Sequence, residues 1–257
     1  MGWCEMLRSE RPLVVRGIFG ALLISALGFL PVWPASALTV TLNDYEPTRL
    51  TTLASDGVAP ASVTEVLPAS TPYLDTLSNV DGAASNSTQY SLLDSGFHIT
   101  FEHARTALYD SQAISNAGVS FRVDEDVSYE LLGSYAAIDS DGRRISLFAQ
   151  LADRTSLEQL FYNSQESRST PDESFLLGGE EGDFINSLNG STTGVLIAGH
   201  DYLFSFQASL QASPSAATTS ATASGWVSLD FTPVPEPSAG ALLLLGLVFA
   251  LSRGRRT

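Results

Sequence analysis

Residues 201–211 read Asp-Tyr-Leu-Phe-Ser-Phe-Gln-Ala-Ser-Leu-Gln. From Tyr202 to Leu210 an apolar side chain stands at every second position, with mainly Ser and Gln between. Successive side chains of a β-strand point to opposite faces, so this stretch predicts a strand with one apolar and one polar face. Just upstream, Val195–Ala198 is apolar and Gly199-His200 suits a tight turn. We therefore expect a β-hairpin whose apolar face covers a core.

The same two-residue period recurs along the chain, in short segments separated by polar residues. No stretch between residues 38 and 232 sustains a helical period. Many short strands without helices are typical of two antiparallel sheets packed face to face. We predict an all-β fold, an antiparallel β-sandwich with a jelly-roll-like path, for residues 38–232. The other predicted strands are Leu38–Leu42, Phe97–Phe101, Val119–Val123, Val127–Tyr135, Arg144–Leu151, Leu157–Tyr162 and Gly225–Phe231.

Four segments predict less regular structure. Asp44–Ser87 is rich in Thr, Ser, Ala and Pro, and we expect loops there with one or two short strands. Ala104–Asn116 has no clear period and could hold a short helical turn. Asn163–Gly190 is a long polar stretch with several glycines, and a loop of such length is usually functional or mobile. Ser213–Ser224 consists mostly of Ser, Thr and Ala and predicts a further loop.

The N-terminal 37 residues have the parts of a secretory signal peptide. Three arginines precede an apolar run, Gly17–Leu30, and the small residues Ala35 and Ala37 follow it. A charged region, an apolar region and an A-x-A site in this order predict recognition by signal peptidase. We expect cleavage after Ala37, which makes 1–37 the signal peptide. An uncleaved signal anchor is the alternative.

The C-terminal tail, 233–257, has three blocks of different physical character. A proline-containing motif is followed by an apolar segment at 239–251 and a basic end at 252–257. Each proline fixes its own φ and pushes the preceding residue toward an extended conformation, so the motif predicts an extended, solvated segment. As a helix the apolar segment would be about 20 Å long, which is shorter than the ~30 Å hydrocarbon core of a membrane. The motif residues are Val234, Pro235, Glu236, Pro237 and Ser238, and the arginines of the basic end are Arg253, Arg255 and Arg256.

A short transmembrane helix with arginines on its cytoplasmic side suits a temporary hold in the membrane. The order of motif, apolar segment and arginines resembles the PEP-CTERM sorting tail of Gram-negative bacteria. The resemblance implies processing by an exosortase, a membrane-embedded cysteine transpeptidase, and delivery to the cell surface or the extracellular (biofilm) matrix, where exopolysaccharide is the usual companion. An ordinary C-terminal membrane anchor is the alternative. The resemblance covers only the tail and implies nothing about the activity of residues 38–232.

Charge narrows the range of partners. The chain has 28 acidic residues against 13 arginines and no lysine, for a formal net charge of −15. Nucleic acid is disfavoured because it needs a basic patch, and anionic lipid is disfavoured for the same reason. Divalent cations and neutral polysaccharide fit better, and plain solubility is the alternative explanation of the charge. The single cysteine, Cys4, lies in the signal peptide, so we expect no disulfide and no cysteine nucleophile in the mature protein.

Few residues suggest a catalytic centre, and we expect no enzyme. No Gly-x-Ser-x-Gly motif and no phosphate-binding glycine loop occurs. His98 and His103 have the wrong spacing for a helical pair of metal ligands, and His200 follows a turn, so we predict three surface histidines. A glycosidase would need two carboxylates across a cleft. The acidic residues of the long polar segment that could supply them are Glu180, Glu181 and Asp183.

Calcium is the one cofactor that the sequence suggests, since it binds oxygen ligands of acidic loops. Asp139 and Asp141 lie in an Asp-Ser-Asp-Gly segment, 139–142, that predicts a hairpin turn. The Asp-Glu-Asp run at 124–126 is a second acidic cluster, and neither fits an EF-hand loop. For both, a solvated turn without metal is the alternative.

Aromatic residues raise the question of sugar binding. Tyr90, Tyr135, Tyr162 and Trp226 could stack on sugar rings, but Tyr135 and Trp226 lie within predicted strands, and we expect both in the core. An exposed aromatic row on a concave sheet face would favour a carbohydrate-binding module, whereas a flat polar face would count against it.

The sequence therefore predicts an exported, non-enzymatic β-sandwich with a structural or adhesive role. A carbohydrate-binding module of the same fold is the second hypothesis, and a secreted hydrolase is the third. The expected partners are signal peptidase, an exosortase, the inner membrane before processing, and exopolysaccharide.

The position of the mature N-terminus is a direct test of the predicted signal peptide. Cleavage after Ala37 should leave Leu38 as the first residue of the exported protein, because the small residues before it fit the peptidase. Intact-mass and N-terminal mass spectrometry of the exported protein measure this. A terminus upstream of Ala37 contradicts the prediction.

Overall fold

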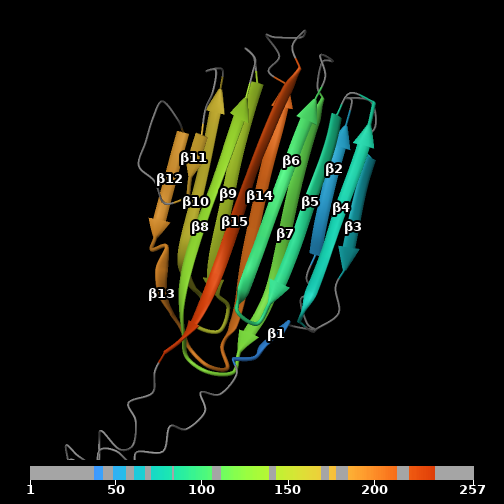
Figure 1. The fold of residues 1–257 in the computed structure, drawn as a ribbon. Coiled ribbons are helices and arrows are strands. Elements are labelled where there is room, and N and C mark those ends of the chain that lie inside the picture. Colours follow the sequence, from blue (N-terminus) through green and yellow to red (C-terminus); the bar gives the residue numbers. More distant parts are fainter. Residues whose placement is uncertain are drawn as a thin grey trace, which may run out of the picture. The chain divides into compact units, whose positions relative to one another are not determined.

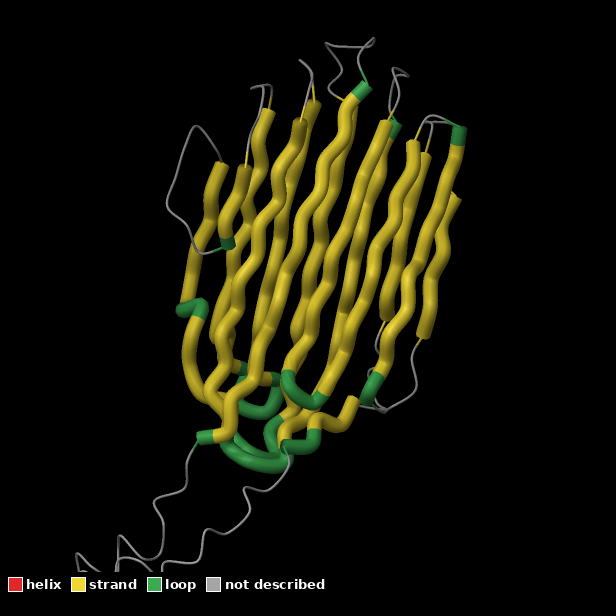
Figure 2. Tube along the Cα trace, viewed as in Figure 1, coloured by secondary structure: helices red, strands yellow, loops and turns green. Residues whose placement is uncertain are grey.

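The structure is a computed structural model that describes residues 38–42, 49–55, 61–66, 71–82, 84–105, 111–138, 143–168, 174–177, 185–212 and 220–234. Every helix or strand in these ranges is a β-strand, as Figure 2 shows, which confirms the predicted all-β class. Leu38–Val234 forms one compact unit. The second unit, Met1–Ala37 with Pro235–Thr257, lies outside the described residues, and so do the predicted signal peptide and nearly all of the sorting tail. In the part of the chain that is described, no helix is long and apolar enough to cross a membrane.

The strands form two antiparallel sheets. Sheet A has the order β12-β10-β9-β14-β7-β2-β3, with β1 also paired to β7, and sheet B has the order β11-β8-β15-β6-β5-β4, with β13 also paired to β8 (Figure 1). The strands of sheet A are β1 (Val40–Leu42), β2 (Arg49–Ser55), β3 (Ala61–Val66), β7 (Gln112–Val123), β9 (Arg143–Asp153), β10 (Glu158–Arg168), β12 (Ile185–Gly190) and β14 (Asp201–Ala212). The strands of sheet B are β4 (Tyr73–Asp81), β5 (Ala84–Leu93), β6 (Gly96–Arg105), β8 (Val127–Ile138), β11 (Ser174–Leu176), β13 (Thr193–Leu196) and β15 (Ala221–Pro233).

The apolar faces of the two sheets meet in one hydrophobic core. Phe97 of β6 packs edge-on against Phe121 of β7 across the sheets, with ring centroids 5.0 Å apart, and lies 5.3 Å from Phe231 of β15. Aromatic pairs of this geometry contribute about 0.5–1.5 kcal/mol each beyond the area that they bury. The alternating apolar residues predicted to face inward from β14 all belong to this core: Tyr202, Phe204, Phe206, Ala208 and Leu210. The two sheets therefore form a β-sandwich.

Two predicted hairpins are wrong because their strands lie in different sheets. Strand β13 pairs with β8 in sheet B, whereas β14 pairs with β7 and β9 in sheet A, so the turn at Gly199 crosses between the sheets. Strands β8 and β9 also belong to opposite sheets, so they do not form the hairpin that was predicted around 139–142, a segment outside the described residues. Alternation shows which residues of a strand face the core, but it does not show to which of the two sheets the strand belongs.

Segments that were expected to be largely irregular contain strands. Asp44–Ser87 includes β2, β3, β4 and the start of β5, and Asn163–Gly190 includes most of β10 together with β11 and β12. In Ala104–Asn116 the described residues belong to β6 and β7 or directly precede β7, and they hold no helical turn. The loop predicted at Ser213–Ser224 gives way to β15 at Ala221. Composition misled here because strands such as β5 turn small polar side chains into the interior, where they are hydrogen-bonded.

Strands β14 and β15 occupy the middle of their sheets. Strand β14 lies between β9 and β7, and β15 lies between β8 and β6 (Figure 1). A strand with a neighbour on each edge has its backbone N–H and C=O groups bonded on both sides. Strand β15, the last strand before the predicted sorting motif, is thus held by hydrogen bonds on both of its edges.

Both ends of the compact unit are fixed to the same connection, residues 124–126 between β7 and β8. The Thr39 N–H donates to Asp124 Oδ1 at 2.9 Å, and the Val234 N–H donates to the Asp126 carbonyl oxygen at 3.1 Å. The Ala198 N–H donates to Asp126 Oδ1 at 2.8 Å. Figure 1 accordingly shows β1 and the end of β15 at one end of the sheets. The two aspartates of the predicted second calcium cluster thus serve as acceptors for backbone N–H groups.

Candidate binding face on sheet B

The outward face of sheet B is built mainly from small polar side chains. Strand β15 exposes Ser224 and Trp226 on this face, because its alternate residues are in the core. The antiparallel register places Thr100 of β6 and Ser134 of β8 directly opposite Trp226, one on each side. Trp226 is therefore the one large side chain among small immediate neighbours.

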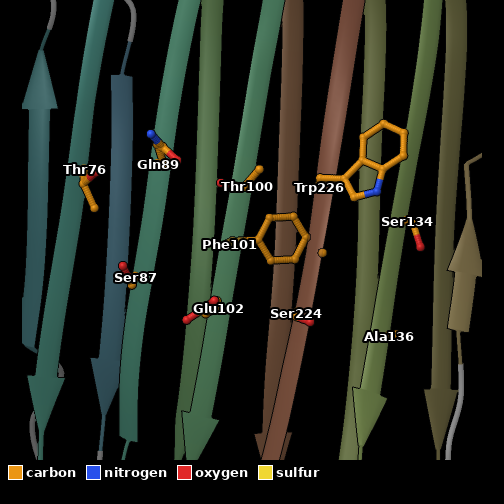
Figure 3. A pocket seen from close by; sticks show the side chains of 11 residues that line it. Thr76, Ser87, Gln89, Thr100, Phe101, Glu102, Ser134, Ala136, Ser224 and Trp226 are labelled. Atoms are coloured by element: carbon orange, nitrogen blue, oxygen red, sulfur yellow. The ribbon is translucent and has the colours of Figure 1, made fainter.

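Trp226 is 41% exposed, so its predicted place in the core is wrong. Figure 3 shows the indole spreading from β15 toward Ser134 with its broad side turned to the viewer. The sequence contained a signal for this position, since Val227 and Leu229 follow the inward period of β15 and Trp226 falls between the inward positions. Its place within a strand predicted burial, but the phase of a residue in its strand determines which face it occupies.

A shallow hollow of about 540 Å³ lies over the strands beside the indole. Its floor depends on Gly225, because a Cβ there would lie 2.6 Å from Phe101 Cζ and 2.3 Å from the Ser134 carbonyl oxygen. The buried Phe101 ring can pack against the Gly225 backbone only without that side chain. We call this hollow and its lining the Trp226 face. Besides Trp226, its polar residues are Thr76, Ser87, Gln89, Thr100, Glu102, Ser134 and Ser224.

Charge on the Trp226 face is negative. Glu102 is the one charged residue that lines the hollow. Farther along the same face His98 Nε2 lies 2.9 Å from Asp230 Oδ1, and both side chains are partly exposed, as predicted for His98. In the described residues of β4, β5, β6, β8 and β15, Arg105 is the only arginine or lysine, and it is 2% exposed. The face thus offers hydrogen-bonding groups without an exposed basic side chain.

A second group of polar side chains lies inside the core and links the two sheets. His103 of β6 lies 2.8 Å from Ser115 Oγ of β7 through Nε2 and 2.9 Å from the Tyr135 hydroxyl of β8 through Nδ1. Thr88 of β5 hydrogen-bonds to the Ser115 hydroxyl and donates to Asn86 Oδ1. The prediction of a surface position for His103 is wrong, since the residue is 2% exposed. Burial disfavours the imidazolium ion and lowers the pKa of His103 to about 3.

The Ser115–His103 contact has the elements of a nucleophile and base, but the core encloses it. Ser115 is fully buried, and Tyr135 and Thr88 occupy the remaining sides of the pair. A nucleophile needs a neighbouring position where a substrate atom can sit. The arrangement instead satisfies buried polar groups, and it fixes the two sheets relative to each other with directional bonds.

His200 forms a pair with Asp153 at the end of sheet A. Its Nδ1 lies 2.8 Å from Asp153 Oδ2, and the Thr155 and Ser156 N–H groups donate to Asp153 Oδ1. Burial alone would raise the pKa of Asp153, but the hydrogen bonds from His200 and the backbone outweigh it and hold the pKa below its ordinary value. The histidine is partly exposed, and the pair closes the turn after β9.

The other aromatic candidates for sugar stacking are less accessible than Trp226. Tyr90 and Tyr135 are fully buried, which confirms the predicted core position of Tyr135. The Tyr90 hydroxyl donates to the Asn116 carbonyl oxygen at 3.1 Å. Tyr162, on sheet A, is half-buried and packs edge-on against Phe148 at 5.6 Å. Trp226 is therefore the aromatic residue of the four that a ligand can reach most easily.

Several predicted site residues lie outside the described residues. They include the calcium candidates Asp139 and Asp141 and the carboxylates of the hydrolase alternative. They also include the signal-cleavage residues, the arginines of the basic end and the sorting motif beyond Val234. Within the described ranges no three or more His, Cys, Asp or Glu side chains gather as a metal site would require.

No protein-family model matches the chain, and no curated protein matches it. The chain is similar to a structure of the Gt strain of infectious bursal disease virus, at 12% identity over 83% of this chain and 71% of that one, with a TM-score of 0.17. It is also similar to a VP2 subviral particle of the same virus, at 12% identity over 85% and 72% of the chains, again with a TM-score of 0.17. At this identity and TM-score, the similarity supports no conclusion about the fold or the function of the chain.

Replacing His103 should change the pH dependence of stability. Because the ordinary pKa of 6.5 applies to the unfolded chain and about 3 to the folded one, the unfolded chain binds more protons between these values. The free energy of unfolding then falls as the pH falls from about 6.5 toward about 3. His103→Asn should flatten that slope, as measured by urea unfolding at several pH values.

Ser115→Ala is the matched control for this prediction. It removes the same link between the sheets and should cost about 1–3 kcal/mol at neutral pH, yet it keeps the titrating ring. Its slope between pH 6.5 and 4 should stay close to that of the wild type. Equal slopes for wild type and His103→Asn would contradict the prediction.

Proposed function

We propose that this chain is an exported β-sandwich protein that an exosortase processes and places at the cell surface or in the extracellular matrix of a Gram-negative-type bacterium. The observation that carries the proposal is the order of proline motif, apolar segment and arginines at 234–257. The signal-peptide pattern at 1–37 supports the same route, since a protein placed at the cell surface must first be exported. In this proposal the apolar segment holds the chain in the inner membrane until the tail is processed.

The motif directly follows the last strand of the folded unit in the sequence, which supports its accessibility. Strand β15 ends at Pro233, and Val234 is 37% exposed although its N–H is hydrogen-bonded to Asp126. The prolines at 235 and 237 favour an extended backbone beyond this point. A transpeptidase that binds an extended substrate would thus find its motif immediately after the last strand.

The role proposed at the destination is structural or adhesive, and not enzymatic. A sandwich with long strands, a continuous core and an acidic composition suits a stable, dispersed surface protein. The jelly-roll-like path belongs to the same proposal, and the interleaving of β14 and β15 between earlier strands supports it. A carbohydrate-binding module is the second candidate. The described residues of this face do not form the aromatic row that was expected to favour it, but the single exposed Trp226 supports it more than it supports a secreted hydrolase. Calcium at Asp139 and Asp141 remains a proposal without further support.

Processing of the tail tests the proposal in the producing cell. With an active exosortase, the wild-type chain should lose its apolar segment and appear at the surface or in the matrix. A chain with Pro235→Ala and Pro237→Ala should keep its full tail and stay in the membrane fraction, because the extended motif is lost. Cell fractionation with intact-mass analysis measures both.

Pro214→Ala is the control, since it changes a proline of the chain outside the motif. It should be processed like the wild type. The proposal fails if cells that lack the exosortase trim and release the chain as usual.

A further inference from the structure

The Trp226 face joins an exposed aromatic ring to a rigid support. Trp226 lies on β15, which is hydrogen-bonded to β8 and β6 along its two edges. Thr100 and Ser134 stand beside it and are too small to cover the indole. Covering apolar surface contributes about 25 cal/mol per Å². A flat ligand with an apolar side would therefore gain by lying on this ring, with little ordering of the protein.

Hydrogen-bonding side chains lie near the Trp226 indole on the neighbouring strands of the sheet. Glu102 lies on β6, the strand next to β15, and Gln89 lies on β5, one strand farther. Neighbouring strands are about 4.8 Å apart, so Gln89 lies about 10 Å from β15. Figure 3 shows Gln89, Thr100 and Glu102 on one side of the indole and Ser134 on the other. Carboxylate, amide and hydroxyl groups together supply both donors and acceptors.

A pyranose ring has the matching chemistry. One of its sides presents C–H groups, and its rim presents hydroxyls that both donate and accept hydrogen bonds. The hollow of about 540 Å³ is open along the sheet and extends from β8 to β4, which leaves room for more than one sugar unit. An aromatic platform with polar groups on its flanks fits a segment of polysaccharide better than a single small molecule.

The charge of the face selects among polysaccharides. Glu102 lines the hollow, and Arg105, the only basic residue in the described parts of these strands, is turned inward. A uronate, sulfate or phosphate group would meet a carboxylate without a compensating cation. Neutral sugars avoid this repulsion, and Glu102 can accept hydrogen bonds from their hydroxyls.

A protein partner fits the face less well. The centre of a protein–protein interface is usually rich in apolar side chains, whereas Trp226 is bordered by serines and threonines. Among the described residues of sheet B, the other exposed large apolar side chains are Leu132 of β8, Leu74 and Val80 of β4 and Val195 of β13, and none of them lines the hollow. The face therefore lacks the contiguous apolar area that a second copy or another protein would bury.

We propose that the Trp226 face binds neutral hexopyranose units of a polysaccharide. The apolar side of one sugar ring stacks on the indole of Trp226, while Glu102 and Gln89 hydrogen-bond to hydroxyls of this unit and of its neighbour. The proposal rests on the adhesive part of the proposed function and not on exosortase processing. The site would bind sugar whether or not the tail is removed.

Sugar binding by the full-length chain tests the proposal. The protein is kept in a zwitterionic detergent without a sugar head group and is applied to an array of neutral and uronate-containing glycans. At least one neutral hexose oligosaccharide should bind, and uronate polymers should bind more weakly. Trp226→Ala should weaken binding of the best neutral oligosaccharide about tenfold or more, as expected for a central stacked tryptophan.

Fluorescence locates the contact, because the chain has only three tryptophans, Trp3, Trp33 and Trp226. Titration with the best neutral oligosaccharide should change the tryptophan emission in a saturable way. Trp226→Phe should abolish the emission change while calorimetry still detects weakened binding, since a smaller aromatic ring remains. Leu74→Ala, at an exposed apolar residue of the same sheet on β4, is the matched control and should bind like the wild type.

Four results would overturn the proposal. They are the absence of binding to any neutral glycan on the array, unchanged binding by Trp226→Ala, tighter binding of a uronate polymer than of every neutral glycan, and a Trp226-dependent dimer without a sugar response. Thermal unfolding of each variant shows that a loss of binding does not reflect a loss of fold. Failure of tail processing would leave these results unchanged, so the two proposals can fail separately.

Discussion

The central place of β15 in sheet B is the constraint on which the rest of the structure depends. This strand is hydrogen-bonded to β8 on one edge and to β6 on the other, although β6 and β8 are far earlier in the chain. Its inward residues Val227, Leu229 and Phe231 are buried in the core, and its outward Trp226 stands on the candidate binding face. The strand ends at Pro233, directly before the predicted sorting motif. One element thus completes the core, carries the exposed ring and leads into the tail.

The placement of β14 and β15 affects the order in which the sheets can form. Both sheets are incomplete until the last residues before the motif are available, because these strands separate β7 from β9 and β6 from β8. Contacts between segments so distant in sequence form late and slowly. In the proposed route, the tail holds the chain in the membrane while this closing pair is inserted. The Val234 N–H bond to Asp126 then fixes the end of the strand beside the connection that also binds Thr39.

Polar residues in the core explain much of what the sequence could and could not predict. Alternation identified β9, β14, most of β6 and the second half of β7, because their inward residues are mostly large and apolar. It missed β4 and much of β5, where Asn86 and Thr88 point inward and are bonded to each other and to sheet A. His103 was misplaced for the same reason, since its partners Ser115 and Tyr135 come from other strands. Polar residues that satisfy one another across sheets look, in sequence alone, like surface residues.

The sequence does not show which strands pair, and this limits the prediction of both the sheet topology and the binding face. The apolar period of residues 201–211 shows which side chains face inward, but not that the preceding strand lies in the opposite sheet. The outward direction of Trp226 could have been read from the phase of its own strand. The sequence does not reveal that the small residues Thr100 and Ser134 lie beside it, because this depends on which strands pair. The hollow is therefore a property of the sheet and not of any one segment.

Amide hydrogen exchange of the full-length chain tests the central place of β15 most directly. Strands bonded on both edges and covered by the core open only with large parts of the structure, whereas edge strands open locally. The account predicts that the amides of 222–231 exchange among the slowest in the chain, together with those of β14, and far more slowly than those of the edge strand β4. Exchange in β15 as fast as in β4 would contradict it.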